Sequence, residues 1–129
     1  MRFMSLYKPG RESDAPPTEQ EMAAVGQLIE ELAKAGILIA TDGLQSSAKG
    51  ARVRIDKGKF TVTDGPFAET KELIGGYAIL NAKSKEEAIE LTKRFLFLMG
   101  EGECEIRQMQ DVPAFEAPDS QRAEVAAKG

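Results

Sequence analysis

The sequence of 129 residues contains no histidine and a single cysteine, Cys104. Without histidine, the usual zinc ligand sets and any imidazole acid or base are excluded. One cysteine also has no partner for an internal disulfide bond. Proton chemistry is therefore left to carboxylates, lysines, tyrosines and one thiol, and we expect neither a metal ion nor another cofactor.

A long apolar segment and a concentration of positive charge are missing as well. The longest apolar run, residues 95–99, is far shorter than the roughly 20 residues that span a bilayer. Residues 8–11 (Lys-Pro-Gly-Arg) interrupt the apolar start that a secretory signal needs. The net charge is −4 and the 17 basic residues are scattered along the chain, which disfavours binding to nucleic acid. We therefore expect a cytoplasmic protein that binds neither membranes nor nucleic acid.

A chain of this length suits one hydrophobic core, because two halves of it would each be marginally stable. We expect a single domain over residues 1–112. Residues 113–129 begin with proline and are rich in alanine and glutamate. This end predicts a tail that is mobile or docked on a partner subunit.

Short strands are expected at four places along the chain. Along residues 2–8 successive side chains point to opposite faces, as in a strand. Residues 37–40, 77–82 and 104–110 are also expected to form strands. The stretch 37–40 is entirely apolar, so we expect it to be buried. A turn is expected after it, at residues 42–43.

Two helices are expected to begin at capping boxes, in which a hydroxyl side chain accepts from a backbone N–H and a glutamate three residues later reaches back. The first runs from Thr18 to Gly36 and the second from Ser84 to Gly100, with a glycine ending each. Apolar side chains at helical spacing are expected to face the core. They are Met22, Val25, Leu28, Ile29 and Leu32 in the first helix, and Ala88, Leu91, Phe95, Leu98 and Met99 in the second.

Residues 52–63 predict a β-hairpin that turns at residues 56–59. Because side chains alternate along each strand, the hairpin should present one apolar and one polar surface. The apolar surface is expected to carry Val53, Ile55, Phe60 and Val62, and the polar surface Arg52, Arg54, Thr61 and Thr63.

The element order is strand-helix-strand, then the hairpin, then strand-helix-strand. This order predicts an α+β protein, a ferredoxin-like split β-α-β sandwich with an inserted hairpin and both helices on one sheet face. The opposite face is then bare, although its side chains are too apolar for solvent and partly too polar for a dry core. The residues expected there include Phe3, Ser5, Tyr7, Tyr77, Ile79, Glu105, Arg107 and Met109. A second copy that covers this face would form a dimeric α+β barrel, a two-fold homodimer with a cleft between the sheets.

The most informative local motif begins with Asp64, Gly65, Pro66 and Phe67 in the middle of the chain. Pro66 fixes its own backbone and pushes Gly65 toward an extended conformation, so the turn is stiff. Pro66 also lacks the N–H that an aspartate two residues earlier would normally bind. The Asp64 carboxylate is therefore expected to accept from a later donor, such as the N–H of Phe67 or Ala68.

The charged side chains around this turn are the candidate site. One interpretation is purely structural, with Phe67 directed into the core or the dimer interface and the charges solvated. The functional interpretation places Asp64 and Glu69 as acid/base catalysts at the mouth of the cleft, where a small polar or anionic metabolite would bind. The candidate ligand-binding residues are Tyr7, Arg54, Lys71, Glu72, Tyr77 and Arg107. Cys104 is expected to be a small buried side chain without a lowered pKa.

Residues 63–72, followed by Gly75, Gly76 and Tyr77, closely resemble the signature of the DGPF, or YCII-related, family of small bacterial proteins. The resemblance covers about residues 1–110. It implies a dimeric α+β barrel built on a ferredoxin-like protomer. Because most members of this family have no assigned function, the resemblance implies little about activity.

The chain differs from that family in two respects. Many members have a His-Pro or Cys-Pro element after the second helix and a Val-Arg-Pro ending, where this chain has residues 95–99 and 105–108 instead. A His-Asp pair is proposed as catalytic in related YCII proteins, and this sequence has no histidine, whereas Arg107 matches an arginine of the family. Three hypotheses stay open. The first is a homodimer that binds a small metabolite and is non-catalytic or regulatory. The second is an enzyme, an isomerase, lyase or hydrolase of a lactone-like metabolite. The third is an accessory interaction module of a sigma-factor system, which only the resemblance suggests.

Overall fold

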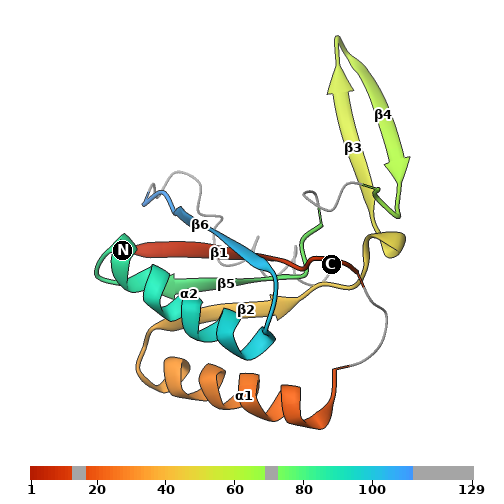
Figure 1. Cartoon of the computed structure of the whole chain (residues 1–129). Helices are drawn as coiled ribbons and strands as arrows, with labels where there is room; N and C mark the ends of the chain where they lie inside the picture. Colours follow the sequence, from red (N-terminus) through yellow and green to blue (C-terminus); the bar gives the residue numbers. More distant parts are fainter. Residues whose placement is uncertain (13–16, 69–72, 112–129) are drawn as a thin grey trace, which may run out of the picture.

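The structure, a computed structural model, describes residues 1–12, 17–68 and 73–111 (Figure 1). The elements in chain order are β1 (Arg2–Lys8), α1 (Glu19–Lys34), β2 (Leu38–Gly43), the 3-10 turn η1 (Ser47–Lys49), β3 (Ala51–Asp56), β4 (Lys59–Asp64), β5 (Gly76–Asn81), α2 (Lys85–Met99) and β6 (Glu103–Gln108). Every helix and strand that the sequence predicts is present. The predicted tail, residues 113–129, lies outside the described residues.

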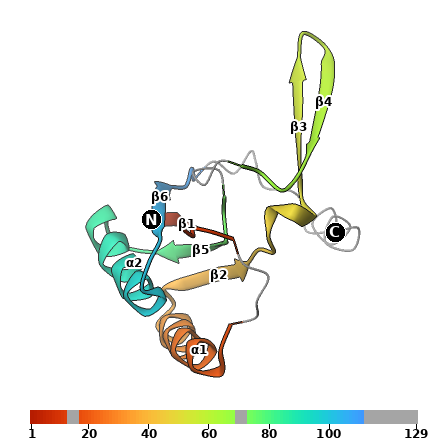
Figure 2. The same ribbon diagram turned by 45° about the vertical axis from the view of Figure 1, so that its right-hand side comes forward.

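The main sheet has four strands in the order β2-β5-β1-β6, and each neighbouring pair is antiparallel. With the hairpin set aside, this is the strand order of a ferredoxin-like fold, so the predicted α+β class is confirmed. Both helices cover the same face of the sheet (Figures 1 and 2). Within the described part of the chain, neither helix is long and apolar enough to be a membrane span.

The predicted helix starts are confirmed. At α1 the Thr18 hydroxyl accepts from the Glu21 N–H at 3.1 Å, and the Glu21 carboxylate accepts from the Thr18 N–H at 3.3 Å, which completes the capping box. At α2 the Ser84 hydroxyl accepts from the Glu87 N–H at 3.2 Å, but the second half of the predicted capping box does not form, because the Glu87 carboxylate accepts from the Lys83 N–H at 3.4 Å instead. Gly100 ends α2 with a φ of 83°, a left-handed conformation that glycine adopts without strain.

The predicted facing of β1 is wrong. Phe3, expected on the bare face, is 2% exposed and packs with Ala88 of α2 in the core. Ser5 lies 3.5 Å from the Thr92 hydroxyl of α2, so its polar group has a partner under the helix. Tyr7 meets the Phe95 ring of α2 edge to face, with ring centroids 5.3 Å apart. The strand alternates as predicted, but the set of side chains expected outside is the one that the helices cover.

The face opposite the helices carries the other set of β1 side chains. In the sheet register Met4 is paired with Ile79 and Arg107, and Leu6 with Tyr77 and Glu105. These six residues therefore share one surface, which we name the open sheet face. No helix of the described residues covers it (Figures 1 and 2). The sequence placed Tyr77, Ile79, Glu105 and Arg107 on this face correctly.

Strand β2 differs from the expectation of a short buried strand. It continues through residues 42–43, where a turn was predicted, and a bulge interrupts its pairing between Leu38 and Ala40. Ile39 is exposed. Strand β2 lies at the edge of the sheet, next to β5. Because an edge strand is less covered than a central one, its apolar residues are not all buried.

Helix α1 buries less of its apolar side than its spacing predicts. Leu28 and Leu32 are buried, whereas Met22 and Ile29 are exposed. Arg94 of α2 donates two hydrogen bonds to the Glu31 carboxylate, at 2.6 and 3.0 Å, and so ties the two helices together. The N-terminal half of α1 is left beside a cavity, described below.

The Glu31–Arg94 pair predicts a stability difference that depends on pH. The hydrogen bond from Arg94 lowers the pKa of Glu31 below its ordinary value of 4.5. The pair therefore stabilises the folded protein when the pH is above 4.5, the ordinary pKa of the carboxyl group. This contribution to stability is lost as the pH falls through the lowered pKa of Glu31. We expect Glu31→Gln to be less stable than the unmodified protein at pH 7 and equally stable once the pH is below both pKa values.

Urea unfolding at the two pH values measures this effect. Glu30→Gln is the control, because Glu30 is one position away and is paired with Lys34 in an exposed bridge within the same helix. It should lose less stability at pH 7 than Glu31→Gln. Equal losses from both variants would mean that the contact between the helices contributes nothing.

The hairpin forms a separate two-stranded sheet that projects from the body of the protein (Figure 1). We name residues 51–64 the arm. Val53 is paired with Val62 and Ile55 with Phe60, so these four side chains share one face, as predicted. All four are exposed.

Candidate functional site

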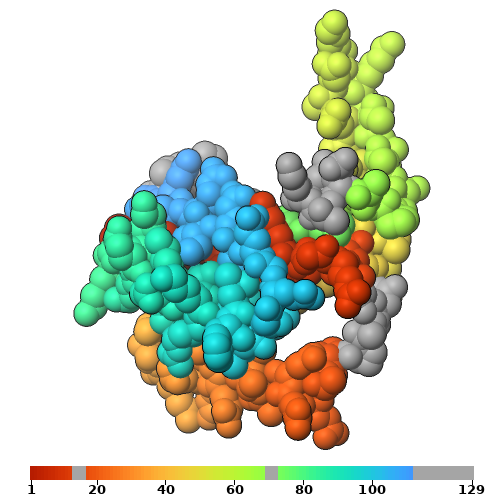
Figure 3. Space-filling view, in the orientation of Figure 1, coloured from red at the N-terminus to blue at the C-terminus, as the bar shows by residue number. Residues whose placement is uncertain are grey.

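A cavity of about 820 Å³ lies between the sheet and the two helices. This volume is in the range of small-molecule sites, roughly 300–1,000 Å³. The sheet contributes side chains from β1, β2 and β5, and the helices contribute the apolar sides of α1 and α2. Figure 3 shows the molecule hollowed where α1 (orange) faces the end of α2 (cyan) and the N-terminal segment (red). The cavity exists because the N-terminal half of α1 does not pack against the sheet.

The lining of the cavity is mostly apolar, with a few polar groups. The apolar side chains include Val25, Leu28, Leu32, Leu80, Leu91 and Phe95, and the polar residues include Tyr7, Arg11, Thr41, Ser46 and Cys104. Two of the hydroxyls have protein partners. Tyr7 donates to the Glu101 carbonyl at 3.2 Å, and Thr41 donates to the Tyr77 carbonyl at 2.8 Å.

Ser46 is the exception among these hydroxyls. Its Oγ is buried and has no hydrogen-bond partner in the described part of the chain. Leaving a buried hydroxyl without a partner costs about 1–3 kcal/mol. A polar atom of a bound molecule would remove that cost, because Ser46 borders the cavity.

Two titratable groups in the wall, Tyr7 and Cys104, have raised pKa values and are therefore held in their neutral forms. Burial raises the pKa of Tyr7, and the nearby Cys104 and Glu101 raise it further. Burial also raises the pKa of Cys104, and a hydrogen bond with Ser5 offsets this in part. A thiol with a raised pKa is a poor nucleophile at neutral pH. Cys104 is only half-buried, whereas a buried side chain was expected, and the expectation that its pKa is not lowered is confirmed.

The central turn packs against η1. The Phe67 N–H donates to the Ser47 hydroxyl at 3.0 Å, and the Gly65 N–H donates to the Gly50 carbonyl at 3.0 Å. The Arg52 guanidinium lies 3.8 Å from the centre of the Phe67 ring, a cation–π contact. Of the donors expected for the Asp64 carboxylate, the Phe67 N–H is therefore not the one, because it donates to Ser47.

Glycine is required at position 65. A Cβ atom there would lie 1.6 Å from the Ser47 carbonyl oxygen, where no side chain fits. Ser47 is itself held by the Glu12 carboxylate, which accepts from its N–H at 2.6 Å and from its hydroxyl at 2.7 Å. Since Glu12 and Ser46 border the cavity, the turn supports the cavity rim from outside.

Sequence reasoning missed the roles of Glu12 and Ser47. The two residues are 35 positions apart, and both are ordinary loop residues. No local pattern links them, so only the folded chain reveals the contact.

The predicted site residues do not gather at one place. Tyr7 and Tyr77 border the cavity. Arg54 lies on the arm, Arg107 lies on the open sheet face, and Asp64 is exposed at the end of β4. The remaining candidates, Glu69, Lys71 and Glu72, lie outside the described residues. The structure thus places Arg54 and Asp64 away from the cavity, and it places Arg107 on the open sheet face that Tyr77 shares.

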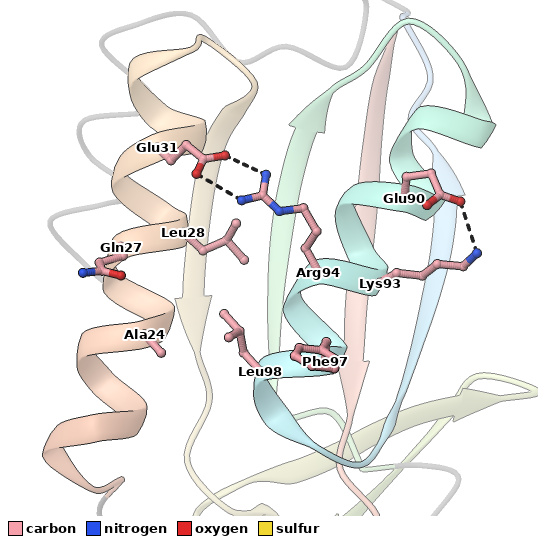
Figure 4. A pocket seen from close by; sticks show the side chains of 9 residues that line it. All are labelled: Ala24, Gln27, Leu28, Glu31, Glu90, Lys93, Arg94, Phe97 and Leu98. Atoms are coloured by element: carbon pink, nitrogen blue, oxygen red, sulfur yellow. Dashed lines mark hydrogen bonds and ion pairs between the residues drawn. The ribbon is translucent and has the colours of Figure 1, made fainter.

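A second hollow, of about 470 Å³, lies on the outer side of the helix layer between α1 and α2 (Figure 4). The Glu31–Arg94 bridge crosses it, and Leu28 and Leu98 lie along it. Phe97 is on its rim and is 86% exposed. This groove is the outer seam of the two helices, whereas the larger cavity reaches the sheet.

The fold and the cavity define a small ferredoxin-like α+β protein with a hollow of ligand size beneath its helices. Comparison with protein families gives a more specific result: the model of the YCII-related domain matches residues 1–113, and the chain belongs to this family.

The proteins similar to this chain include the following two. An uncharacterized protein, R00369, from Rhizobium meliloti (strain 1021) is 31% identical over 75 residues, which is 58% of this chain and 60% of that protein. The match thus spans well under two thirds of the relative. A solved structure of 5-chloro-2-hydroxyhydroquinone dehydrochlorinase (TftG) from Burkholderia phenoliruptrix AC1100, in complex with 2,5-dihydroxybenzoquinone, is 13% identical, with a TM-score of 0.46 over 90% of this chain and 100% of that chain. At this distance the likeness assigns no residue role.

Proposed function

We propose that this protein binds a small molecule, with an apolar body and a polar or anionic end, in the cavity between its sheet and its helices. The observation that carries the proposal is the buried Ser46 hydroxyl, which has no partner in the described residues and borders an apolar cavity of ligand size. Ligand sites commonly combine an apolar lining with a few polar groups that fix orientation.

Different groups in the lining of the cavity suit different parts of such a molecule. Leu28, Leu32 and Phe95 offer contacts to an apolar body between the helices and the sheet. Ser46 can donate a hydrogen bond to a polar end, and the exposed Arg11 at the rim offers a positive charge to an anion. The central turn borders this site indirectly, through Ser47 and Glu12.

Two groups in this wall favour binding over a reaction. The Tyr7 phenol and the Cys104 thiol stay protonated at neutral pH, so neither is a nucleophile or a base. Asp64 is exposed at the end of β4 and does not border the cavity. A ligand in contact with both α1 and the sheet would favour closer packing of α1, a shift between states that suits a regulatory role.

The test uses 8-anilinonaphthalene-1-sulfonate, a fluorescent probe with an apolar body and an anionic end. We expect saturable binding of one probe per chain. Ala78 faces the helices, since it is paired with Ser5, and it borders the cavity, so Ala78→Leu fills space that the probe needs. The variant should bind at least about tenfold more weakly, a loss of roughly 1.4 kcal/mol. Ala33→Leu makes the same change on an exposed position of α1 outside the cavity and should bind normally.

Cys104 gives a second measurement on the unmodified protein, because it is the sole cysteine and borders the cavity. Saturating probe should slow its reaction with a disulfide reagent such as 5,5′-dithiobis(2-nitrobenzoate). If Ala78→Leu binds the probe as well as Ala33→Leu does, or if the probe leaves the Cys104 rate unchanged, the cavity is not the binding site.

A further inference from the structure

The cavity beneath the helices extends along α1, and its depth changes along that helix. Helix α1 contributes lining residues from Glu21 to Leu32. At a rise of about 1.5 Å per residue this stretch is about 16 Å long. Met22, near its beginning, is 61% exposed, whereas Leu32, at its end, is 6% exposed. The cavity is therefore open beside the N-terminal end of α1 and closed beside the C-terminal end.

The closed end is apolar. The Ile37 N–H donates to the Leu32 carbonyl at 2.9 Å, which places the start of β2 beside the end of α1. Leu38 of β2 is paired with Leu80 of β5, and both residues border the cavity. Leu80 is 4% exposed. These leucine side chains offer contacts to hydrocarbon and no hydrogen bond.

The open end holds the Ser46 hydroxyl. Strand β2 runs beside α1 from the closed end toward the N-terminal end of the helix (Figure 1). Ser46 follows β2 by three residues and therefore lies at the open end. The hydrogen bonds between Glu12 and Ser47 hold the segment before α1 at the same end. The cavity thus accommodates hydrocarbon at one end and provides a hydrogen-bonding group at the other.

The lining favours a flexible chain over a ring system. The rings of Tyr7 and Phe95 already contact each other edge to face. Tyr77 belongs by register to the open sheet face, so its ring is directed away from the helices. Met22 and Met99 also border the cavity, and unbranched thioether side chains adapt to irregular shapes. The contacts left for a ligand are mainly aliphatic.

The position of Ser46 favours an uncharged head group. Its Oγ atom is buried, and burying a charge costs much more than burying a hydroxyl or a carbonyl that forms a hydrogen bond. Among the described residues, the charged ones that border the cavity are Arg11, Glu12, Glu21 and Asp42. One positive and three negative charges give a net charge of −2, so an anionic head would meet more repulsion than attraction.

Resting on the proposed binding function, we propose that the ligand is an unbranched aliphatic molecule of medium length with an uncharged oxygen head, such as a fatty alcohol or the ester or amide of a fatty acid. The head oxygen accepts a hydrogen bond from Ser46, and the chain extends between α1 and β5 toward Leu32 and Leu80. Carbon–carbon bonds of about 1.5 Å at angles near 111° advance a chain by about 1.3 Å per carbon, so about 12 carbons match the length of the cavity.

Titration calorimetry with 1-hexanol, 1-octanol and 1-decanol tests the chain. Each added methylene should raise the affinity of the unmodified protein about fourfold, equivalent to about 0.8 kcal/mol per buried methylene. Ala78 lies midway along β5 between Gly76 and Leu80, so Ala78→Leu blocks the closed half of the cavity. In this variant 1-octanol and 1-decanol should bind no more tightly than 1-hexanol. Ala33→Leu, outside the cavity, should keep the full gain.

Three further measurements test the shape and the head of the ligand. Cyclooctanol has the carbon number and the hydroxyl of 1-octanol, and it should bind about tenfold more weakly because a ring leaves the closed end unfilled. Ser46→Ala should weaken the binding of 1-octanol about fivefold, as expected for one lost hydrogen bond. The same variant should not lower the stability of the free protein, because the Ser46 hydroxyl has no partner in the described residues. Octanoate should bind more weakly than 1-octanol.

The chain assignment is overturned if the affinity does not rise from 1-hexanol to 1-decanol, or if cyclooctanol binds as tightly as 1-octanol. These measurements use the unmodified protein and hold even if Ala78→Leu does not fold. The head assignment is overturned if Ser46→Ala binds 1-octanol normally, or if octanoate or octylamine binds more tightly than 1-octanol.

Failure of the chain proposal is distinguishable from failure of the proposed function. If Ala78→Leu weakens the anilinonaphthalene probe while the alcohols show no gain with length, the cavity is a binding site for another class of molecule. If the probe does not bind in the cavity at all, the proposed function fails and the assignment of the chain fails with it.

Discussion

Replacing Phe3 with alanine is expected to lower the free energy of unfolding by about 3–5 kcal/mol, the range measured for large aromatic truncations in protein cores. Phe3 is 2% exposed and packs with Ala82 and Ala88, while Ile106 lies against this cluster. The truncation removes the largest buried side chain of the described core and leaves a cavity between β1 and α2. Urea unfolding followed by circular dichroism, at one fixed protein concentration, measures the loss.

Phe97→Ala is the matched control. It makes the same chemical change on α2, at a side chain that is 86% exposed, so the change in unfolding free energy should stay within about 0.5 kcal/mol. The difference between the losses of unfolding free energy in Phe3→Ala and Phe97→Ala shows which face of β1 the helices cover. Similar small losses for both variants would place Phe3 on the open sheet face and would contradict the described packing.

Replacing Gly65 with alanine is expected to destabilise the protein by about 2–4 kcal/mol, a large effect for one methyl group. The new Cβ would lie 1.6 Å from the Ser47 carbonyl oxygen, so the turn or η1 must move. Any such movement strains the hydrogen bonds that join Phe67, Ser47 and Glu12. We also expect weaker binding of the anilinonaphthalene probe, because these contacts support the cavity rim.

Gly26→Ala adds the same methyl group where nothing lies within 4 Å of the new Cβ. Gly26 is an exposed interior residue of α1, and alanine favours a helix over glycine by about 1 kcal/mol. This variant should be more stable than the unmodified protein. In thermal unfolding we therefore expect a lower melting temperature for Gly65→Ala and a higher one for Gly26→Ala. If the Gly65→Ala protein were as stable as the unmodified one, the turn would not pack closely against Ser47.

The candidate site was only partly predictable from the sequence. The Asp64-Gly65-Pro66-Phe67 motif was recognised as a stiff turn, and the family that it indicates is confirmed. Its charged residues suggested a functional cluster, yet the described part of the turn serves as a support for the cavity rim. No pattern in the sequence indicated the cavity itself. A hollow beneath α1 depends on the distance between the helix and the sheet, and the spacing of apolar residues does not report that distance.

The sequence by itself determined the features that depend on near neighbours. Thr18 with Glu21 and Ser84 with Glu87 start the helices through contacts three residues apart. The two faces of the arm follow from alternation along two adjacent strands. These interactions need no information from the rest of the chain, so they can be read locally.

Only the tertiary structure decided which apolar surfaces are covered and by what. Both faces of β1 are apolar enough to be buried, and the choice of Phe3 over Met4 depends on the fit against α2. The hydrogen bonds that Ser47 donates to Glu12, and that Phe67 donates to Ser47, join segments far apart in the sequence. Such contacts depend on competition among all the surfaces of the folded chain, which no short stretch of residues contains.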